Sequence, residues 1–426
     1  LWIQMTPNLY TKTYWLNSVL VFLFFAVLMT VEKNFGVTSL LLLAASIYAL
    51  PFNFHQLKII PRHLPYWLLG ASALLLMNLL LREPWDPERL NLIIFFICLI
   101  PIYYNLSNVG FSIQALRLGL YVAIIIGALV SNYEYSTLNN SRAGTALRPQ
   151  LSGLVAVIFL CYFVARLSYL FKNLKHKPNL FEAALNVSAI IASFIIVNLS
   201  GSKSPVLALI VLVLFFSIYF KLYLKPRGII SILIVILSSA GFYTTQTDNP
   251  LIQRMSSAMQ IIIQSDIGDY DDGSLGARVE IWKTGLNIFE HNPIFGVGFG
   301  EKTFAIKEAQ LELNLQSTIF NYSTEMHSNY VDLLVLFGAV GLLMFLIFTG
   351  IVLITYFKNR SYLKQETPIL FLAHILGFLI YGISEVFVGY VHGTALFFFP
   401  IVIFISYINF TKKTQLVNSI NDALNV

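Results

Sequence analysis

Charged residues are scarce in this chain of 426 residues: Asp, Glu, Lys and Arg together make up only 11% of it. Soluble domains carry about 25% charged residues, so a soluble protein of this length could not cover its surface with the charges available. Hydrophobic residues instead make up 57% of the chain, and the mean hydropathy is +0.74. This composition excludes a soluble enzyme, a DNA-binding module and a disordered or collagen-like chain.

Cysteine is also rare, with only Cys98 and Cys161, and each lies inside an apolar block. Two buried thiols in apolar surroundings usually pack as small hydrophobic side chains, and a disulfide between them is the alternative. Basic residues never run to the five or more in sequence that bind nucleic acid. We therefore expect no nucleic-acid partner despite the net charge of +6.

The apolar residues come in blocks of about 20, the length that crosses a bilayer as an α-helix. The sequence therefore predicts an all-α polytopic membrane protein. The first block is not followed by a small-residue cleavage site, so we expect an uncleaved span rather than a signal peptide. Twelve spanning helices are predicted, at residues 14–31, 36–50, 66–81, 90–104, 111–131, 150–169, 182–199, 204–222, 228–245, 326–356, 367–386 and 390–409.

The distribution of Lys and Arg predicts how these helices are oriented, because cytoplasmic loops carry an excess of both. One side of the predicted bundle holds 16 of the 27 basic residues and the other side holds 11. Five of the 11 lie in one long loop, to which the rule does not apply, so the short loops compare as 16 to 6. Both termini are therefore expected in the cytoplasm.

The long loop, residues 246–325, divides the chain into helices 1–9 (residues 1–245), an outward loop, and helices 10–12 with a cytoplasmic tail (residues 326–426). It contains 11 carboxylates and 5 cations, the opposite balance to the whole chain. Loops of this length in compact folds are usually functional. The chain has no evident internal repeat, which argues against a transporter built on inverted repeats.

An amphipathic helix is predicted inside this loop, over residues 274–290. Ser274 can cap its start, and Pro293 lies just beyond its end. An apolar stripe with helical spacing runs along it, formed by Val279, Trp282, Leu286 and Phe289. Such a helix can lie on the bilayer surface, with Trp282 at the level of the headgroups.

Three side chains at the predicted outer rim could carry chemistry. Lys203 lies in a short turn between two helices, where Gly201 lets backbone amides approach an anion; a snorkelling lysine is the alternative. Arg278 lies in the first turn of the loop helix; a solvated charge or a contact with lipid headgroups is the alternative. His327 lies where the long loop re-enters the bilayer and could move a proton near neutral pH or be structural.

Further residues near this rim are candidates for contacts with a substrate. Arg142 and Arg148 lie in another outward loop, with the same alternative as Lys203. Tyr330 lies three residues after His327 and would share its helix face. His374 lies mid-helix without a charged neighbour, so we expect a buried core residue with its hydrogen bonds satisfied.

Two other patterns are rejected on their spacing. Residues 296–300 contain three glycines but lack the spacing and the βαβ context of a dinucleotide-binding loop. Residues 269–273 are rich in aspartate but miss the calcium-loop pattern, so a solvated acidic turn is the better interpretation and no metal is expected.

The residues around His327 resemble a known signature. His327 and Ser328, nine further residues, then Gly338, two residues and Gly341 match that of bacterial O-antigen ligases. In that signature a His is followed by Asn, Ser or Gln, nine residues, a Gly, two residues, and Gly, Thr or Tyr. Residues 274–282 and 293–298 also resemble the broader superfamily of O-antigen ligases and polymerases, and the layout of twelve spans with one long loop is similar throughout.

The resemblance implies a GT-C type, inverting glycosyltransferase of the bacterial inner membrane that needs neither a metal nor another cofactor. Such an enzyme takes a glycan from undecaprenyl pyrophosphate and transfers it to the lipid A-core on the periplasmic face. Arg278 then corresponds to the family's loop arginine and His327 to its essential histidine. Lys203 lies where the family usually has arginine, and lysine lacks the bidentate fork that suits phosphate.

Other functions remain open from the sequence. An O-antigen polymerase or a protein O-oligosaccharyltransferase would use the same type of donor. A non-enzymatic flippase would need charges scattered along several helices, whereas the span interiors are nearly charge-free in sequence, as expected from the cost of burying charge in lipid. The enzymatic interpretation predicts that Lys203, Arg278 and His327 converge on one diphosphate site. The sequence assigns no role to Glu385 and His392, near the last outward turn.

Overall fold

The computed structural model describes residues 7–29, 35–53, 60–81, 87–137, 143–145, 147–172, 180–220, 274–315, 325–363 and 366–424, and all regular elements within these ranges are helical. They are α1 (Pro7–Val27), α2 (Phe35–Asn53), α3 (His63–Leu81), α4 (Pro87–Val109), α5 (Ile113–Thr137), α6 (Pro149–Lys172), α7 (Leu180–Leu199), α8 (Lys203–Phe220), α11 (Ser274–His291), α12 (Gly298–Glu312), α13 (Asn329–Asn359), the 3₁₀ helix η3 (Arg360–Tyr362), α14 (Thr367–Tyr381) and α15 (Val391–Leu424).

Seven of the described helices are long and apolar enough to cross a membrane, which fits the predicted polytopic membrane protein. Three more are apolar but shorter, over Val37–Ala49, Lys203–Ile218 and Thr367–Tyr381. The predicted span 228–245 lies outside the described residues, so the count of twelve stays a prediction. The last helix is longer than predicted: α15 continues past residue 409 through a polar segment to Leu424.

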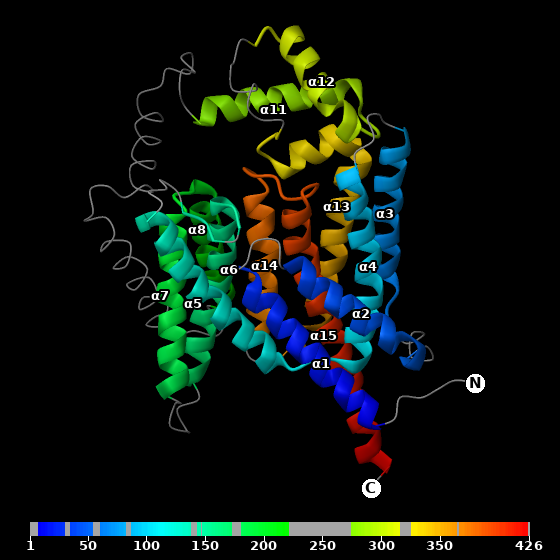
Figure 1. The fold of residues 1–426 in the computed structure, drawn as a ribbon, viewed down its shortest axis with the longest axis vertical. Helices are drawn as coiled ribbons and strands as arrows, with labels where there is room; N and C mark the ends of the chain where they lie inside the picture. Colours follow the sequence, from blue (N-terminus) through cyan, green and yellow to red (C-terminus); the bar gives the residue numbers. More distant parts are fainter. Residues whose placement is uncertain are drawn as a thin grey trace.

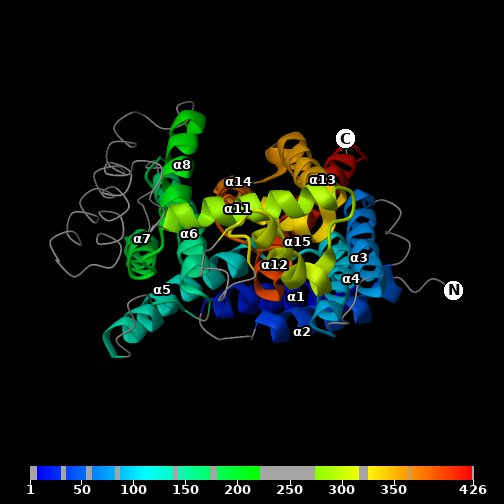
Figure 2. The ribbon, with the colours of Figure 1, turned by 90° about the horizontal axis from the view of Figure 1, so that it is seen from above.

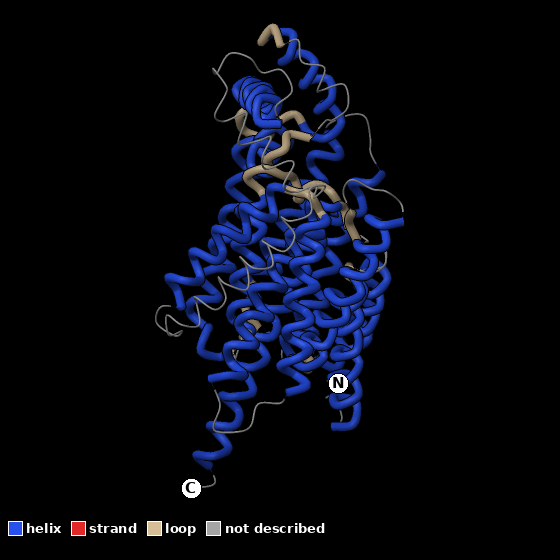
Figure 3. The backbone as a smooth tube through the Cα atoms, turned by 90° about the vertical axis from the view of Figure 1, so that its left-hand side faces the viewer, coloured by secondary structure: helices blue, strands red, loops and turns tan. Residues whose placement is uncertain are grey.

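The long helices form an upright bundle, and α11 lies across one end of it (Figure 1). Seen from above, α11 crosses the bundle from α8 towards α13, with α12 beside it (Figure 2). The larger described loop segments gather at this same end, away from the C-terminus (Figure 3). Helix α1 begins and α15 finishes at the opposite end (Figure 1).

The centre of the bundle is α15, whose apolar stretch is 89% buried. Helices in lipid gain little from hydrophobic exclusion and associate through close packing, which aromatic rings supply here. Phe397 has ring contacts with Phe345, Phe378 and Phe387. The prediction for His374 is confirmed, because it is buried with Nε2 3.0 Å from the Phe397 carbonyl oxygen. Both cysteines are free thiols, so the disulfide alternative is excluded.

A network of largely buried charges lies near the helix ends on the side of the bundle opposite α11. There the Glu366 carboxylate accepts hydrogen bonds from Arg117 at 2.9 Å and Arg166 at 3.2 Å. The Tyr162 hydroxyl donates to the same carboxylate at 3.0 Å, and Arg166 Nε donates to Glu182 at 2.8 Å. Two arginines and two glutamates neutralise one another, which offsets the cost of burying them. The network ties α5, α6 and α7 to the start of α14.

Candidate functional site

Helix α11 begins at Ser274, as predicted, and ends at His291, one residue beyond the predicted end. Its buried face is formed by Ile281, Thr284, Gly285 and Ile288 and packs against α13. Gly285 is needed for this contact, since a Cβ atom there would lie 2.4 Å from Val331 Cγ1.

The apolar stripe predicted to face the bilayer lies on the face of α11 next to the face that packs against α13. Leu286 is exposed, and Val279, Trp282 and Phe289 are partly buried. The Trp282 indole packs against the small apolar cluster between α11, α12 and α13, and its Nε1 is buried without an acceptor among the described residues.

Helix α12 was not predicted, although residues 298–312 are rich in the helix formers Glu, Lys and Ala. Its Lys302 is buried and forms an ion pair of 2.5 Å with Asp332 in the first turn of α13. The same Asp332 oxygen accepts the backbone N–H of Met326 at 3.3 Å. This buried pair holds the segment just before His327 against the loop helices.

The two motif glycines, Gly296 and Gly338, form a joint between the loop and α13. Gly338 interrupts α13 with φ 62° and ψ −158°, a conformation essentially restricted to glycine. The backbone groups near this break bond to the loop instead: Ala339 N donates to Pro293 O at 2.8 Å, and Val297 N donates to Val335 O at 2.8 Å.

Neither glycine leaves room for a side chain. A Cβ atom on Gly338 would lie 2.4 Å from the carbonyl group of Ile294, and one on Gly296 would lie 2.4 Å from the Val335 oxygen. Gly296 and Gly338 therefore have a structural role: they allow the segment after α11 to pack closely against α13.

Two predicted site residues, Arg278 and His327, lie beside one carboxylate, Glu385, in the turn after α14, and the residue after Lys203 bonds to the same group. Arg278 Nη2 donates to Glu385 Oε1 at 3.2 Å, and His327 Nδ1 lies 3.9 Å from Glu385 Oε2. Ser204 Oγ donates to Glu385 Oε1 at 3.2 Å and brings its neighbour Lys203 to the same place. Sequence reasoning assigned Glu385 no role, although it is the single acidic residue between positions 367 and 409.

Lys203 is the first residue of α8 and precedes the predicted apolar span. Its pKa is lowered from the ordinary lysine value, first by burial and then by the positive charge of Arg278. The two cations are therefore close enough to repel each other, and an anion with two phosphate groups would relieve that repulsion.

The backbone of His327 is held in an unusual conformation. Its φ is 45°, in the left-handed region that few residues other than glycine adopt. Asn329 fixes the surroundings: its N–H donates to Gly382 O at 2.8 Å, and its side-chain oxygen accepts the N–H groups of Phe387 and Val388 at 3.2 and 2.9 Å. These bonds hold the turn that carries Glu385 against the start of α13.

The remaining candidates are placed as follows. Arg148 is largely exposed and pairs with Glu325 at 3.0 Å, a bond that raises the pKa of Arg148. Its guanidinium lies 5.8 Å from the ring centroid of Tyr390. Tyr330 donates its hydroxyl to Leu379 O at 2.7 Å and so links α13 to α14. Arg142 lies outside the described residues.

The site as a whole is partly open to its surroundings. Exposed fractions are 27% for the Arg278 side chain, 32% for His327 and 10% for Glu385. His327 Nδ1 is buried and makes no hydrogen bond to any described group. Among the described residues no cluster of three His, Cys, Asp or Glu side chains could hold a metal ion. The arrangement offers two cations, a titratable imidazole and a carboxylate at one end of the bundle.

Comparison with known proteins gives two matches. An uncharacterized protein of Haemophilus influenzae is 22% identical over 399 residues, which cover 91% of this chain and 97% of that protein. Residues 188–346 match a family model described as O-antigen ligase. The matched segment contains Lys203, Arg278 and His327 together with both joint glycines. The resemblance to the O-antigen ligase family that the sequence motifs indicated is thereby confirmed.

Proposed function

We propose that this protein is a glycosyltransferase of the bacterial inner membrane that transfers a glycan from undecaprenyl pyrophosphate to the lipid A-core on the periplasmic face. The observation that carries the proposal is the meeting of Arg278, His327 and the Lys203–Ser204 pair at Glu385. Family similarity over residues 188–346 agrees with it.

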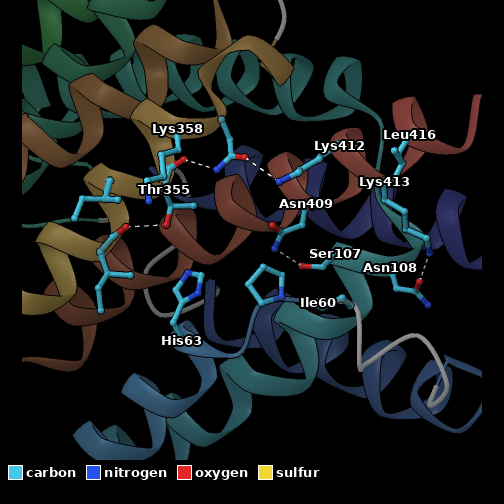
Figure 4. Close-up of a pocket in the computed structure, with 14 residues that line it drawn as sticks. Ile60, His63, Ser107, Asn108, Thr355, Lys358, Asn409, Lys412, Lys413 and Leu416 are labelled. Atoms are coloured by element: carbon cyan, nitrogen blue, oxygen red, sulfur yellow. Dashed lines mark hydrogen bonds between the residues drawn. The ribbon is translucent and has the colours of Figure 1, made fainter. Parts of the chain in front are cut away.

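The two ends of the bundle hold cations that the sequence assigns to opposite sides of the membrane. Arg148, Lys203 and Arg278, which the sequence places on the outward side, lie at the α11 end. Lys358 and Lys412, which it places on the inward side, lie with the C-terminal half of α15 at the other end (Figures 1 and 4). Under the positive-inside rule the α11 end faces the periplasm, and both termini face the cytoplasm.

Donor binding follows from this placement. The polyprenyl tail stays in the bilayer, and the pyrophosphate lies at the rim where Lys203 and Arg278 meet. As the bond between the anomeric carbon and the phosphate oxygen breaks, the electron pair leaves with the pyrophosphate. Fixed cations aimed at that growing charge lower the barrier, so the residues themselves supply what a bound metal would otherwise provide.

His327 acts on the acceptor as the general base. The acceptor hydroxyl attacks the anomeric carbon from the face opposite the pyrophosphate, which inverts the configuration, and its proton passes to the imidazole. Glu385 orients the ring and stabilises the imidazolium that forms. The 3.9 Å separation between His327 and Glu385 would shorten once substrate is bound, because catalytic hydrogen bonds are often long without substrate.

The test is a strain that lacks the protein, with its lipopolysaccharide examined by gel. Loss of every capped band with accumulation of lipid-linked polymer supports a ligase, whereas a cap of one repeat indicates a polymerase. Unchanged lipopolysaccharide with underglycosylated proteins indicates a protein O-oligosaccharyltransferase. In the complemented strain, His327→Ala should abolish transfer at an unchanged protein level, and near-normal transfer would contradict the role of His327.

A further inference from the structure

A second polar site lies at the end of the bundle opposite α11, between α3, α4, α13 and α15 (Figure 4). It is a cavity of about 460 Å³. Three of its lining side chains are lysines: Lys358 at the end of α13, and Lys412 and Lys413 on α15. We call this cavity the lysine pocket. It is remote from Glu385 and has no part in the reaction proposed above.

The positive charge of the lysine pocket is not neutralised by its lining. None of the 14 described residues around the cavity is acidic. Within this lining two of the lysines bond to neutral amides, with Lys412 Nζ 3.5 Å from Asn359 Oδ1 and Lys413 Nζ 2.5 Å from Asn108 Oδ1 (Figure 4). Three ammonium groups around one cavity repel each other, and an anion between them would remove that cost.

Asn108 positions one of the three lysines at the pocket. Its side chain lines the pocket and is only 1% exposed, and its Oδ1 accepts the hydrogen bond from Lys413. Because this amide is neutral, it holds the ammonium group in place without cancelling its charge.

The apolar part of the lining distinguishes between possible anions. Ile351, Ile354 and Leu416 also line the pocket, and Ile354 and Leu416 are 55% and 62% exposed. Phe357, 47% exposed, follows on the same stretch of α13. Acyl chains would cover these side chains, whereas a free phosphate ion would leave them uncovered.

We propose that the lysine pocket binds the phosphate headgroup of an anionic phospholipid, with its acyl chains along the exposed apolar side of α13. Basic pockets between membrane helices suit such headgroups. In the orientation proposed above, this lipid belongs to the cytoplasmic leaflet. Lipid binding at the lysine pocket does not depend on which glycan the protein transfers.

The experiment uses the full-length protein, purified in detergent, delipidated and examined by native mass spectrometry. The probes are dioleoylphosphatidylglycerol and dioleoylphosphatidylcholine, offered in equal amounts. We expect bound phosphatidylglycerol to exceed phosphatidylcholine about 100-fold, because each of the three lysines contributes about a fivefold factor near anionic lipid. K358Q, K412Q and K413Q together should remove most of this preference.

Two matched variants control for charge. K12Q, K283Q and K307Q together remove the same charge from exposed positions outside the pocket and should leave the lipid preference unchanged. K358R, K412R and K413R together should retain binding. If the triple glutamine variant fails to fold, K358Q alone should still reduce binding about fivefold.

Three results would overturn the proposal. Equal binding of the two lipids would remove the preference for an anion. An equal loss in the K12Q, K283Q and K307Q variant would show that net charge, and not the pocket, determines binding. Displacement of phosphatidylglycerol by a millimolar excess of inorganic phosphate would identify the ligand as a free anion.

Discussion

Glu385→Gln is the most direct test of the candidate site, because this substitution keeps the shape of the side chain and removes its charge. Glutamine can still accept the hydrogen bond from Ser204, so the turn after α14 should keep its fold. What disappears is the negative charge beside Arg278 and His327. We expect slower transfer, since the imidazolium that forms on His327 loses its counter-charge.

The size of the effect follows from the geometry. A separation of 3.9 Å with an effective dielectric constant of about 20 gives about 4 kcal/mol between the imidazolium and the carboxylate. The side chains are 32% and 10% exposed, so solvent screening reduces this to about 2 kcal/mol. That energy corresponds to a rate about 30 times slower.

The assay is transfer by purified protein from a lipid-linked donor to an isolated lipid A-core acceptor, with single-turnover rates measured at saturating donor. Glu290→Gln is the control, since it makes the same chemical change at an exposed position of α11. Its rate should equal that of the parent protein. If Glu385→Gln transfers at the parental rate, Glu385 does not stabilise a charge on His327 and the mechanism is wrong.

Two further predictions concern the joint and the lysine. Gly338→Ala should lower the free energy of unfolding by about 2 kcal/mol or more, because alanine is strained at this φ and ψ and its Cβ meets Ile294. The measurement is thermal unfolding in detergent. The control is Gly350→Ala, which should lose no stability because a Cβ there has open space. The pKa of Lys203 is lowered, so its charge disappears as pH rises through that lowered pKa. Lys203→Arg should therefore keep donor binding to higher pH than the parent protein, and coincident alkaline profiles would contradict a role for the Lys203 charge.

The parts of this structure that sequence predicts are those set by local patterns. Hydropathy over about 20 residues identifies spanning helices regardless of how they pack. Ser274, the apolar spacing that follows it and Pro293 fixed the loop helix to within one residue of α11. Lys203 was predicted from its place in a short turn between two apolar segments, and Arg278 from its place in the first turn of the loop helix and from the resemblance to the family's motifs.

The remainder depends on contacts between distant residues. Glu385 follows α14, and its partners Arg278 and Ser204 lie 107 and 181 residues away. Hydropathy places Glu385 at the end of the predicted span 367–386 and can say nothing about what faces it. The buried network around Glu366 escaped prediction for the same reason, since each of its four charges lies near a helix end and looks like an ordinary flanking residue.

The spacing of the histidine motif now has a physical explanation. Gly338 follows His327 by eleven residues, and nine of these steps run along α13 from Asn329, a length of about 14 Å. At Gly338 the loop segment 293–297 joins α13, and from there α11 returns across the end of the bundle to Arg278. The joint therefore fixes the C-terminal end of α11, while Arg278, about 20 Å away along the helix, reaches Glu385 near His327. A side chain at Gly338 would displace α11 from this seat, so the glycine helps to position Arg278 beside Glu385 without contacting either residue.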